Sequence, residues 1–276
     1  MSSRWADELA FATDLARRAG TVLRDSYERI ERIDYKSKRD VVTNADYASE
    51  RLVIDAIKAR YPDDAILAEE SGEHAGVVRD DGSHNGRTWV IDPLDGTVNY
   101  ANGIPYYCVS IGLVVDGRPT VGVVLDPARD DLYAATADGS ATLGGERIRA
   151  STKRTLSDYV VSLAVIGRGG LMRERRIAPV IRIHRRMGSA ALSLAYVANG
   201  RFDAFVQNGG LSLWDVAAAG LIAERSGAVV TDVTGGPWWR QSVRGPRSNI
   251  VAAPRAQHGA LLELLRSLKT TVRTRR

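Results

Sequence analysis

The sequence predicts an α/β layered sandwich, a mixed α+β fold in which helices and sheets are stacked in layers. Short apolar runs separated by hairpin signals fill residues 108–136, which is typical of an antiparallel meander. After residue 158, strand-like and helix-like segments alternate instead. A chain of 276 residues can bury a large core. We therefore expect a single domain of two closely packed lobes, about 1–150 and about 151–276.

Helical spacing of apolar residues and capping signals mark the expected helices. Thr43 or Asn44 can cap the second helix, and Gly200 can end the fourth. Pro179 stands near the end of the third helix or at a kink within it. We expect helices over residues 5–27, 43–60, 171–183, 190–200, 213–227 and 256–268.

Short apolar runs that end at glycine, proline or aspartate mark the expected strands. The polar and basic residues 35–40 predict a mobile loop, and residues 71–86 predict a polar connection. Gly209 and Gly210 predict a turn. We expect strands over residues 65–68, 88–91, 108–115, 119–126, 132–136, 158–166, 202–206, 228–233 and 249–253.

Composition and charge set limits on location and partners. The chain is 44% hydrophobic and 26% charged, with no apolar run of membrane-spanning length. The first 20 residues mix acids and arginines with apolar residues, which favours an amphipathic helix over a signal peptide. Cys108 is the only cysteine, so we expect no intrachain disulfide and a cytoplasmic location. The net charge of +5 argues only weakly for nucleic acid, which we do not expect as a partner.

The segment WVIDPLDGTVNY, residues 89–100, is the most informative part of the sequence. It places Asp92 and Asp95 on a tight turn directly after an apolar strand. Pro93 stiffens the bend, and Gly96 allows the backbone to approach a ligand closely. Thr97 begins a predicted helix, where free backbone N–H groups attract anions. Carboxylates beside an anion site indicate cations between them, and hence Mg²⁺-assisted chemistry on a phosphate.

Four acidic groups share one setting, the end of a strand or the start of a helix. They are Asp46, Glu69 with Glu70, Asp92 with Asp95, and Asp215. Ligands for hard cations often converge in this way at one edge of a sheet. Taken singly, Asp46 and Asp215 could instead stabilise helix N-termini, and the glutamates could be a solvated pair.

The chain resembles the inositol monophosphatases, within the wider Mg²⁺-dependent, lithium-sensitive phosphatase superfamily. The resemblance rests on five segments, residues 40–50, 66–71, 89–100, 188–205 and 214–238. It implies alternating α/β/α/β/α layers of the inositol monophosphatase and fructose-1,6-bisphosphatase type. It also implies two to three Mg²⁺ ions in each active site, inhibition by lithium and a homodimer.

The resemblance also implies roles for individual residues. The first lobe would bind metal and phosphate, and the second would contact substrate and contribute Asp215. The implied metal ligands are Glu69, Asp92, the carbonyl of Leu94, Asp95 and Asp215. The implied catalytic residues are Thr97, hydrogen-bonded to Asp46, and Glu69. The implied substrate contacts are Asp95, Gly96, Thr97, Arg185, Gly188, Ser189, Ala190, Asn208 and Asp215.

Substrate choice is less strongly implied than the chemistry. The family usually has an acidic residue where this chain has Asn208, and an amide accepts hydroxyl hydrogen bonds more weakly than a carboxylate. Arg185 and its basic neighbours could favour a more anionic substrate. Fructose 1,6-bisphosphate, histidinol phosphate and 3′-phosphoadenosine 5′-phosphate are therefore alternatives to inositol monophosphate. A regulatory binding protein of the RNA machinery is an alternative from a different class.

Overall fold

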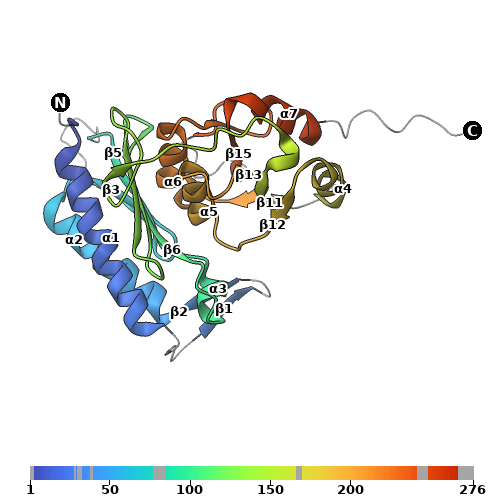
Figure 1. Cartoon of the computed structure of the whole chain (residues 1–276). Coiled ribbons are helices and arrows are strands. Elements are labelled where there is room, and N and C mark those ends of the chain that lie inside the picture. The colour runs from blue at the N-terminus through green and yellow to red at the C-terminus, as the bar shows by residue number, and fades with distance from the viewer. Residues whose placement is uncertain are drawn as a thin grey trace, which may run out of the picture.

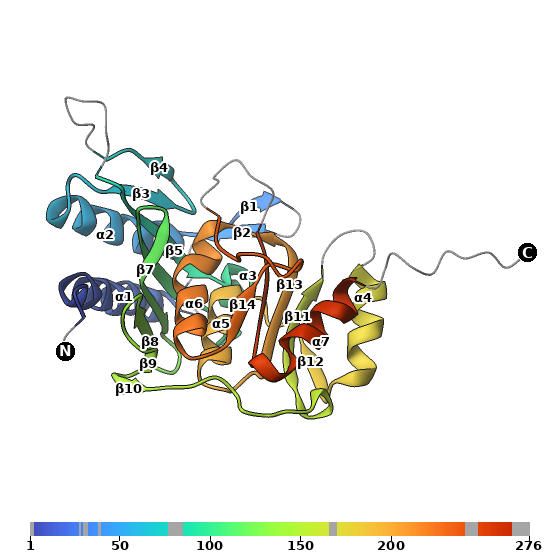
Figure 2. The same ribbon diagram turned by 90° about the horizontal axis from the view of Figure 1, so that it is seen from above.

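The structure is a computed structural model that describes residues 3–27, 29, 33–37, 40–76, 85–165, 170–240 and 248–266. Helices and sheets alternate in five layers, as Figures 1 and 2 show. The first helical layer is α1 (Ala6–Ser26) and α2 (Asn44–Arg60). The middle layer is α5 (Ala190–Ala198) and α6 (Leu213–Arg225), and the last is α4 (Gly170–Ile177) and α7 (Arg255–Arg266). The predicted layered fold is confirmed.

The larger sheet has eight strands in the order β10-β9-β8-β7-β6-β5-β3-β4. Its strands are β3 (Ala65–Ala68), β4 (Gly72–His74), β5 (Arg87–Asp95), β6 (Cys108–Val115), β7 (Arg118–Asp126), β8 (Asp131–Thr136), β9 (Thr142–Leu143) and β10 (Glu146–Arg147). Only the β3–β5 pair is parallel, and β5 to β10 form the predicted antiparallel meander. The short helix α3 (Thr97–Ala101) follows β5.

The smaller sheet has five strands in the order β12-β11-β13-β15-β14. Its strands are β11 (Val160–Val165), β12 (Ile183–Arg185), β13 (Ala204–Leu211), β14 (Val229–Thr231) and β15 (Ser248–Ala253). The strand β11 is parallel to β12 and to β13, whereas β15 is antiparallel to its neighbours. The 3₁₀ turn η1 (Leu156–Asp158) precedes β11, and the 3₁₀ turn η2 (Ala178–Val180) lies between α4 and β12. The predicted division into two lobes stays a prediction.

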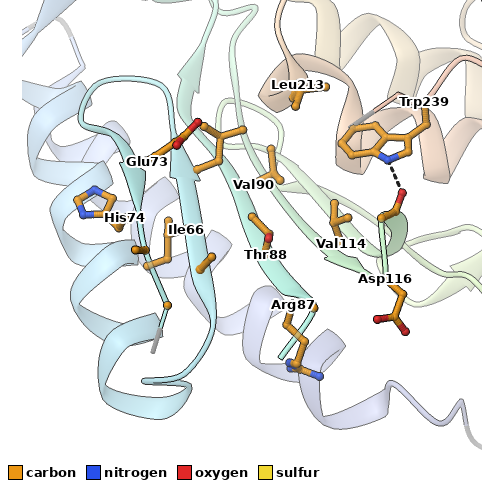
Figure 3. Close-up of a pocket in the computed structure, with 16 residues that line it drawn as sticks. Ile66, Glu73, His74, Arg87, Thr88, Val90, Val114, Asp116, Leu213 and Trp239 are labelled. Carbon is orange, nitrogen blue, oxygen red and sulfur yellow. Dashed lines mark hydrogen bonds between the residues drawn. The ribbon is translucent and has the colours of Figure 1, made fainter. Parts of the chain in front are cut away.

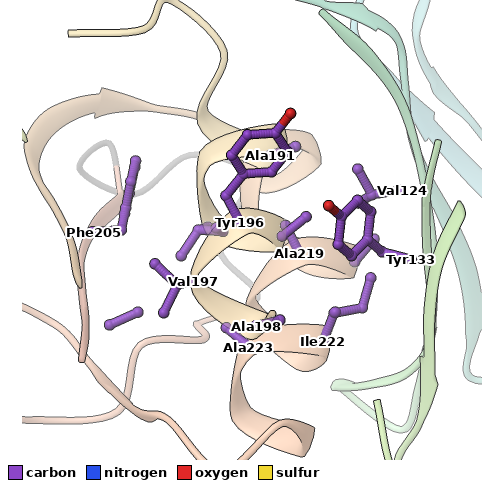
Figure 4. Packing of buried hydrophobic residues seen from close by; sticks show 14 of the residues in the cluster. Val124, Tyr133, Ala191, Tyr196, Val197, Ala198, Phe205, Ala219, Ile222 and Ala223 are labelled. Atoms are coloured by element: carbon purple, nitrogen blue, oxygen red, sulfur yellow. The ribbon is translucent and has the colours of Figure 1, made fainter. Parts of the chain in front are cut away.

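The central strands of each sheet are buried on both faces because helices cover them, whereas the strands β4, β9, β10 and β12 toward the edges are partly exposed. In β5, Trp89 and Ile91 belong to the apolar cluster under α1 and α2, whereas Val90 packs toward the start of α6. The cluster between the sheets joins α5 and α6 to both of them, and Figure 4 shows Tyr196 and Ile222 within it. None of the helices in the described ranges is long and apolar enough to cross a membrane.

Two glycines allow α6 to lie close against the larger sheet. A Cβ at Gly122 would lie 2.6 Å from the carbonyl oxygen of Ala218, and one at Gly112 would lie 3.1 Å from the Cβ of Ala217. Because neither side chain is present, the helix backbone reaches the strands directly. This approach brings the first turn of α6, and with it Asp215, to the end of β5.

Five of the expected elements were wrong. Asp92 and Asp95, expected on a tight turn, lie within β5 at a register shift, and β4 lies within 71–86, where we expected a polar connection. The rest of that connection, residues 77–84, lies outside the described residues.

Within 35–40, where we expected a loop, the described residues belong to β1 (Ile33–Ser37) and β2 (Asp40–Thr43), which pair antiparallel. The helix expected over 171–183 ends at Ile177, where η2 and then the edge strand β12 follow. Gly209 and Gly210 lie inside β13, where the pairing with β15 shifts register, and do not form a turn.

Candidate active site

Three carboxylates from segments far apart in the sequence converge at the end of β5. Oxygen atoms of Asp92, Asp95 and Asp215 all lie within 4.8 Å of one another. Glu69, which follows β3, lies close enough to Asp92 for its charge to raise the pKa of that carboxyl. The Glu69 backbone N–H donates to the Ile91 carbonyl at 3.2 Å, so β3 and β5 hold the two acids side by side. The structure therefore brings together all four predicted metal-binding carboxylates.

The irregular end of β5, where pairing with β6 shifts register between Asp92 and Asp95, and the turn at Gly96 that follows it owe their shape to local contacts. The carboxylate of Asp92 accepts a hydrogen bond from the Leu94 N–H at 3.0 Å. Gly96 has a φ of 97°, in the left-handed region that favours glycine. A Cβ there would lie 3.0 Å from the Tyr106 carbonyl oxygen. Any other residue would therefore strain the turn that presents the carboxylates.

Burial and mutual repulsion perturb the carboxylates strongly. Asp92 is 1% exposed, and desolvation followed by the charges of Glu69, Asp95 and Asp215 raises its pKa well above the usual value. Burial raises the pKa of Asp95 to about 6, although hydrogen bonds from Ser189 and the α5 backbone oppose the shift. Burial, then the Asp95 charge, also raises the pKa of Asp215. Such crowding is stable when a cation neutralises it.

The donor set fits a hard divalent cation. All the side-chain donors in the cluster are carboxylate oxygens, which Mg²⁺ prefers. In the described ranges, no lysine or arginine forms an ion pair with Asp92, Asp95 or Asp215. The Leu94 carbonyl oxygen lies 2.9 Å from the Thr97 hydroxyl oxygen, so it also lies in this segment. The residues present therefore fit the predicted Mg²⁺ site.

The hydroxyl of Thr97 connects the turn to α2. The Thr97 hydroxyl donates a hydrogen bond to Asp46 Oδ1 at 3.1 Å. Asp46 is 1% exposed, and its other oxygen accepts the backbone N–H and the hydroxyl of Thr43 at 2.8 and 2.6 Å. This capping box fixes Asp46 at the start of α2. The predicted Thr97–Asp46 pair is thus present as a hydrogen bond.

The start of α5 reaches the carboxylates from the smaller-sheet side. Ser189 caps α5, and its hydroxyl donates to Asp95 Oδ2 at 2.6 Å. The Ala191 N–H donates to the same oxygen at 2.7 Å. Asn99 holds this loop in place, because its amide donates to the carbonyls of Tyr106 and Met187 at 2.8 and 2.7 Å. The contact of Asn99 with Met187 joins residues 88 positions apart in the sequence, so no local sequence signal could reveal it.

Two cavities border this region, and only one contains the carboxylates. A cavity of about 380 Å³ is lined by Asp95 and Asp215, by Gly188, Ser189 and Ala190, and by side chains from β11 and β13. A larger cavity of about 530 Å³ lies on the sheet face beside β3, with Glu73 and His74 on one side and Trp239 on the other (Figure 3). It contains none of the predicted ligands, so size alone does not identify the site.

At two places along the wall of the 380 Å³ cavity, one residue lines the cavity and its neighbour in the sequence does not. Arg186 and Gln207 line the cavity, whereas Arg185 and Asn208, the residues expected from the sequence, do not. Arg185 is exposed and donates to the carbonyl of His184 at 3.0 Å. Successive residues of a strand point to opposite faces, so an offset of one position decides which side chain reaches the cavity.

Comparison with known proteins gives consistent matches along the chain. The profile of the inositol monophosphatase family matches residues 5–270. The Nus factor SuhB of Escherichia coli strain K12 is 40% identical over 236 residues, 83% of this chain and 86% of that protein. The solved structure of the extragenic suppressor protein suhB from Bartonella henselae is 32% identical, with a TM-score of 0.83 over 93% of this chain and 97% of that chain. An IMPase from Thermotoga maritima is 31% identical, with a TM-score of 0.83 over 94% of this chain and 96% of that chain.

Proposed function

The chain belongs to the inositol monophosphatase family, and from this premise we propose that it is a Mg²⁺-dependent phosphomonoesterase that hydrolyses inositol monophosphate to inositol and phosphate. The observation that carries the proposal is the convergence of Asp92, Asp95 and Asp215 within 4.8 Å. Thr97, which directly follows the segment of Asp92 and Asp95, is hydrogen-bonded to Asp46 at the start of α2. Phosphate monoesters are very inert in water, so this chemistry needs both an activated nucleophile and charge neutralisation.

The metal ligands follow from the geometry and the family. Glu69, Asp92 and the Leu94 carbonyl would hold a first Mg²⁺, and Asp92, Asp95 and Asp215 would hold a second. A third, more weakly held ion would lie near Glu69. When bound, these ions would acidify a water and neutralise charge on the departing oxygen.

The chain's own groups would orient the reaction. Because the Thr97 hydroxyl donates to Asp46, its lone pairs can accept a hydrogen bond from the attacking water. The backbone N–H groups of Gly96 and Thr97 would bind phosphate oxygens, and Glu69 would assist deprotonation of the water. As the new bond between water oxygen and phosphorus forms, the bond from phosphorus to the inositol oxygen breaks; the proton that the attacking water loses through Glu69 passes to solvent, and the inositol oxygen takes up a proton from solvent in its place.

The 380 Å³ cavity would hold the inositol ring beside Gly188, Ser189 and Ala190. Arg186 and Gln207 supply the other charged and amide groups of that wall. The same chemistry on fructose 1,6-bisphosphate, histidinol phosphate or 3′-phosphoadenosine 5′-phosphate is the alternative. A cytoplasmic homodimer inhibited by lithium remains our prediction.

A second candidate function comes from the names of relatives. The 40% identical relative in Escherichia coli is named a Nus factor and not a phosphatase. Together with the net charge of +5, this name keeps a binding role in the RNA machinery open, and with it a nucleic-acid or protein partner. Asp95→Asn separates the two functions, since a cellular role that survives loss of the metal site does not depend on hydrolysis.

The direct experiment measures phosphate release from inositol 1-phosphate by the wild type and by Asp92→Asn. We expect Mg²⁺-dependent release by the wild type and none by the variant at millimolar Mg²⁺. Asp55→Asn, an exposed change on α2, is the control and should act like the wild type. Near-normal turnover by Asp92→Asn would refute the metal assignment.

A further inference from the structure

Three polar side chains on one face of α2 contact three separate parts of the candidate site. Asp46, Ser49 and Glu50 stand at positions i, i+3 and i+4, which lie on the same side of a helix. Their residues are 1%, 0% and 4% exposed. A soluble helix normally turns such residues toward water, so three buried polar groups in one row need partners.

Each of the three side chains has a different partner. Asp46 accepts the Thr97 hydroxyl at 3.1 Å. Ser49 donates to the carbonyl of Pro93 at 3.0 Å, in the middle of the segment that carries the aspartates. The helix therefore fixes that segment at two points.

Glu50 binds the backbone of the segment that carries Glu69, the fourth predicted metal-binding carboxylate. Its Oε2 accepts the Glu70 N–H at 2.8 Å, and its Oε1 accepts the Ser71 N–H at 2.9 Å. These are the two amides directly after Glu69. The Glu69 N–H is bonded to Ile91 on β5, so the backbone around Glu69 is held from both directions. Both oxygens of a buried carboxylate are thus used to fix one turn.

We propose that Glu50 is a positioning residue that sets the place of Glu69 relative to Asp92 and thereby the affinity of the site for its divalent cation. The proposal rests on the proposed function, in which Glu69 is both a metal ligand and the group that assists the water. Glu50 touches neither substrate nor metal in this account. It acts through the turn of Glu70 and Ser71.

The test uses Glu50→Gln, which keeps the size of the side chain but presents an NH₂ group to one of the two N–H donors. We expect Mn²⁺ affinity, measured by calorimetry on the full chain, to fall by about 10–100-fold, as is typical when a partner behind a ligand is lost. The Mg²⁺ concentration needed for half-maximal turnover should rise by a similar factor, while KM for the phosphate ester changes by less than about threefold. Glu50→Asp, which is too short to reach both amides, should show the same split.

Asp55→Asn is the matched control, because Asp55 lies on the same helix, is 68% exposed and contacts only Arg51 among the described ion pairs, at 3.6 Å. It should leave Mn²⁺ affinity and turnover unchanged. A purely structural role for Glu50 would lower the melting temperature of Glu50→Gln and leave Mn²⁺ affinity at the wild-type value in the folded protein. That result would overturn the proposal.

Amide hydrogen exchange on the wild type tests the same idea without a variant. We expect the N–H groups of Glu70 and Ser71 to exchange slowly in the metal-free protein, because Glu50 already holds them. Rapid exchange at both amides would contradict the proposal. If no phosphate ester is hydrolysed, the proposed function fails, but Mn²⁺ affinity and hydrogen exchange still decide the role of Glu50.

Discussion

Neutralising Asp92 should stabilise the metal-free protein while it destroys the metal site. Asp92 is 1% exposed and shares its surroundings with Glu69, Asp95 and Asp215. Two ionised oxygens at 4.8 Å, the limit that contains the three aspartates, repel each other by about 3 kcal/mol at an effective dielectric constant near 20. Asparagine removes this repulsion and keeps an oxygen for the Leu94 N–H.

We expect Asp92→Asn to raise the free energy of unfolding at pH 8, in EDTA, by about 1–3 kcal/mol, less than the full repulsion because burial already favours the neutral form of Asp92. The gain should shift the melting temperature by about 2–4 °C per kcal/mol. At pH 5 the difference should be smaller than at pH 8, because the raised pKa of Asp92 favours the neutral wild-type group increasingly as pH falls. Added Mg²⁺ should raise the melting temperature of the wild type and hardly change that of the variant.

Calorimetric melting of the wild type, Asp92→Asn and the exposed control Asp55→Asn tests these expectations. Each protein is melted at pH 8 and at pH 5, with EDTA and with Mg²⁺. A variant that is less stable than the wild type in EDTA at pH 8 would show that the carboxylate is held by favourable contacts and not by a missing cation. A wild-type response of the variant to Mg²⁺ would place the ion elsewhere.

The remaining predictions concern the nucleophile, the packing of α6, pH and substrate choice. Thr97→Val should lower kcat by about 10²-fold or more, because the attacking water is no longer positioned. Its Mn²⁺ affinity, measured by calorimetry, should stay within about threefold of the wild type. An equal loss of kcat and of Mn²⁺ affinity would contradict a role in orienting water. Gly122→Ala should cost about 1–3 kcal/mol in thermal unfolding and weaken Mn²⁺ binding, because its Cβ would lie 2.6 Å from a backbone oxygen of α6; full stability would mean that the helix can move away freely. The pKa of Asp95 is raised to about 6, so its contribution to metal-free stability is present below the unfolded-state pKa and lost as pH rises through about 6. The shift in melting temperature caused by Mg²⁺ should therefore grow from pH 5 to pH 8, and a larger shift at pH 5 would refute this sign. Gln207→Glu should change the ratio of inositol 1-phosphate to fructose 1,6-bisphosphate hydrolysis more than Asn208→Glu does, and the reverse order would show that Asn208 faces the ring.

Local signals in the sequence predicted the part of the site that one short segment builds. The strand before Asp92 and the helix that starts at Thr97 are present, whereas Asp92 and Asp95 lie within β5, at a shift in its register with β6, and not on a separate turn. The cap of α2 at Thr43 is also confirmed. These features depend on neighbours within a few residues, and their physical causes can be read from the chain directly.

The parts that could not be predicted depend on pairing across the chain. Residues 35–37 carry no apolar alternation, so nothing in that segment predicts the hairpin of β1 and β2. Gly209 and Gly210 have the composition of a turn, yet pairing with β15 keeps them in a strand with a register shift. The contact of Glu50 with Glu70 likewise appears only when α2 packs beside β3.

The lining of the 380 Å³ cavity shows the same limit. The sequence names Asn208 and Arg185 as substrate contacts, which stays a prediction, while Gln207 and Arg186 line the cavity. An offset of one residue cannot be seen in a motif and reverses the face of a strand. The segment that carries Asp92 and Asp95 is therefore better determined by the sequence than the lining of the cavity.

The central claim is that the converging carboxylates serve Mg²⁺-dependent hydrolysis of inositol monophosphate. Phosphate release with and without Mg²⁺, across inositol 1-phosphate, histidinol phosphate, fructose 1,6-bisphosphate and 3′-phosphoadenosine 5′-phosphate, tests it most directly. We predict Mg²⁺-dependent release with the highest kcat/KM on inositol 1-phosphate. Preference for another ester would contradict the substrate and keep the mechanism, and no release from any ester by protein that binds Mg²⁺ would contradict the claim that this site is a phosphatase.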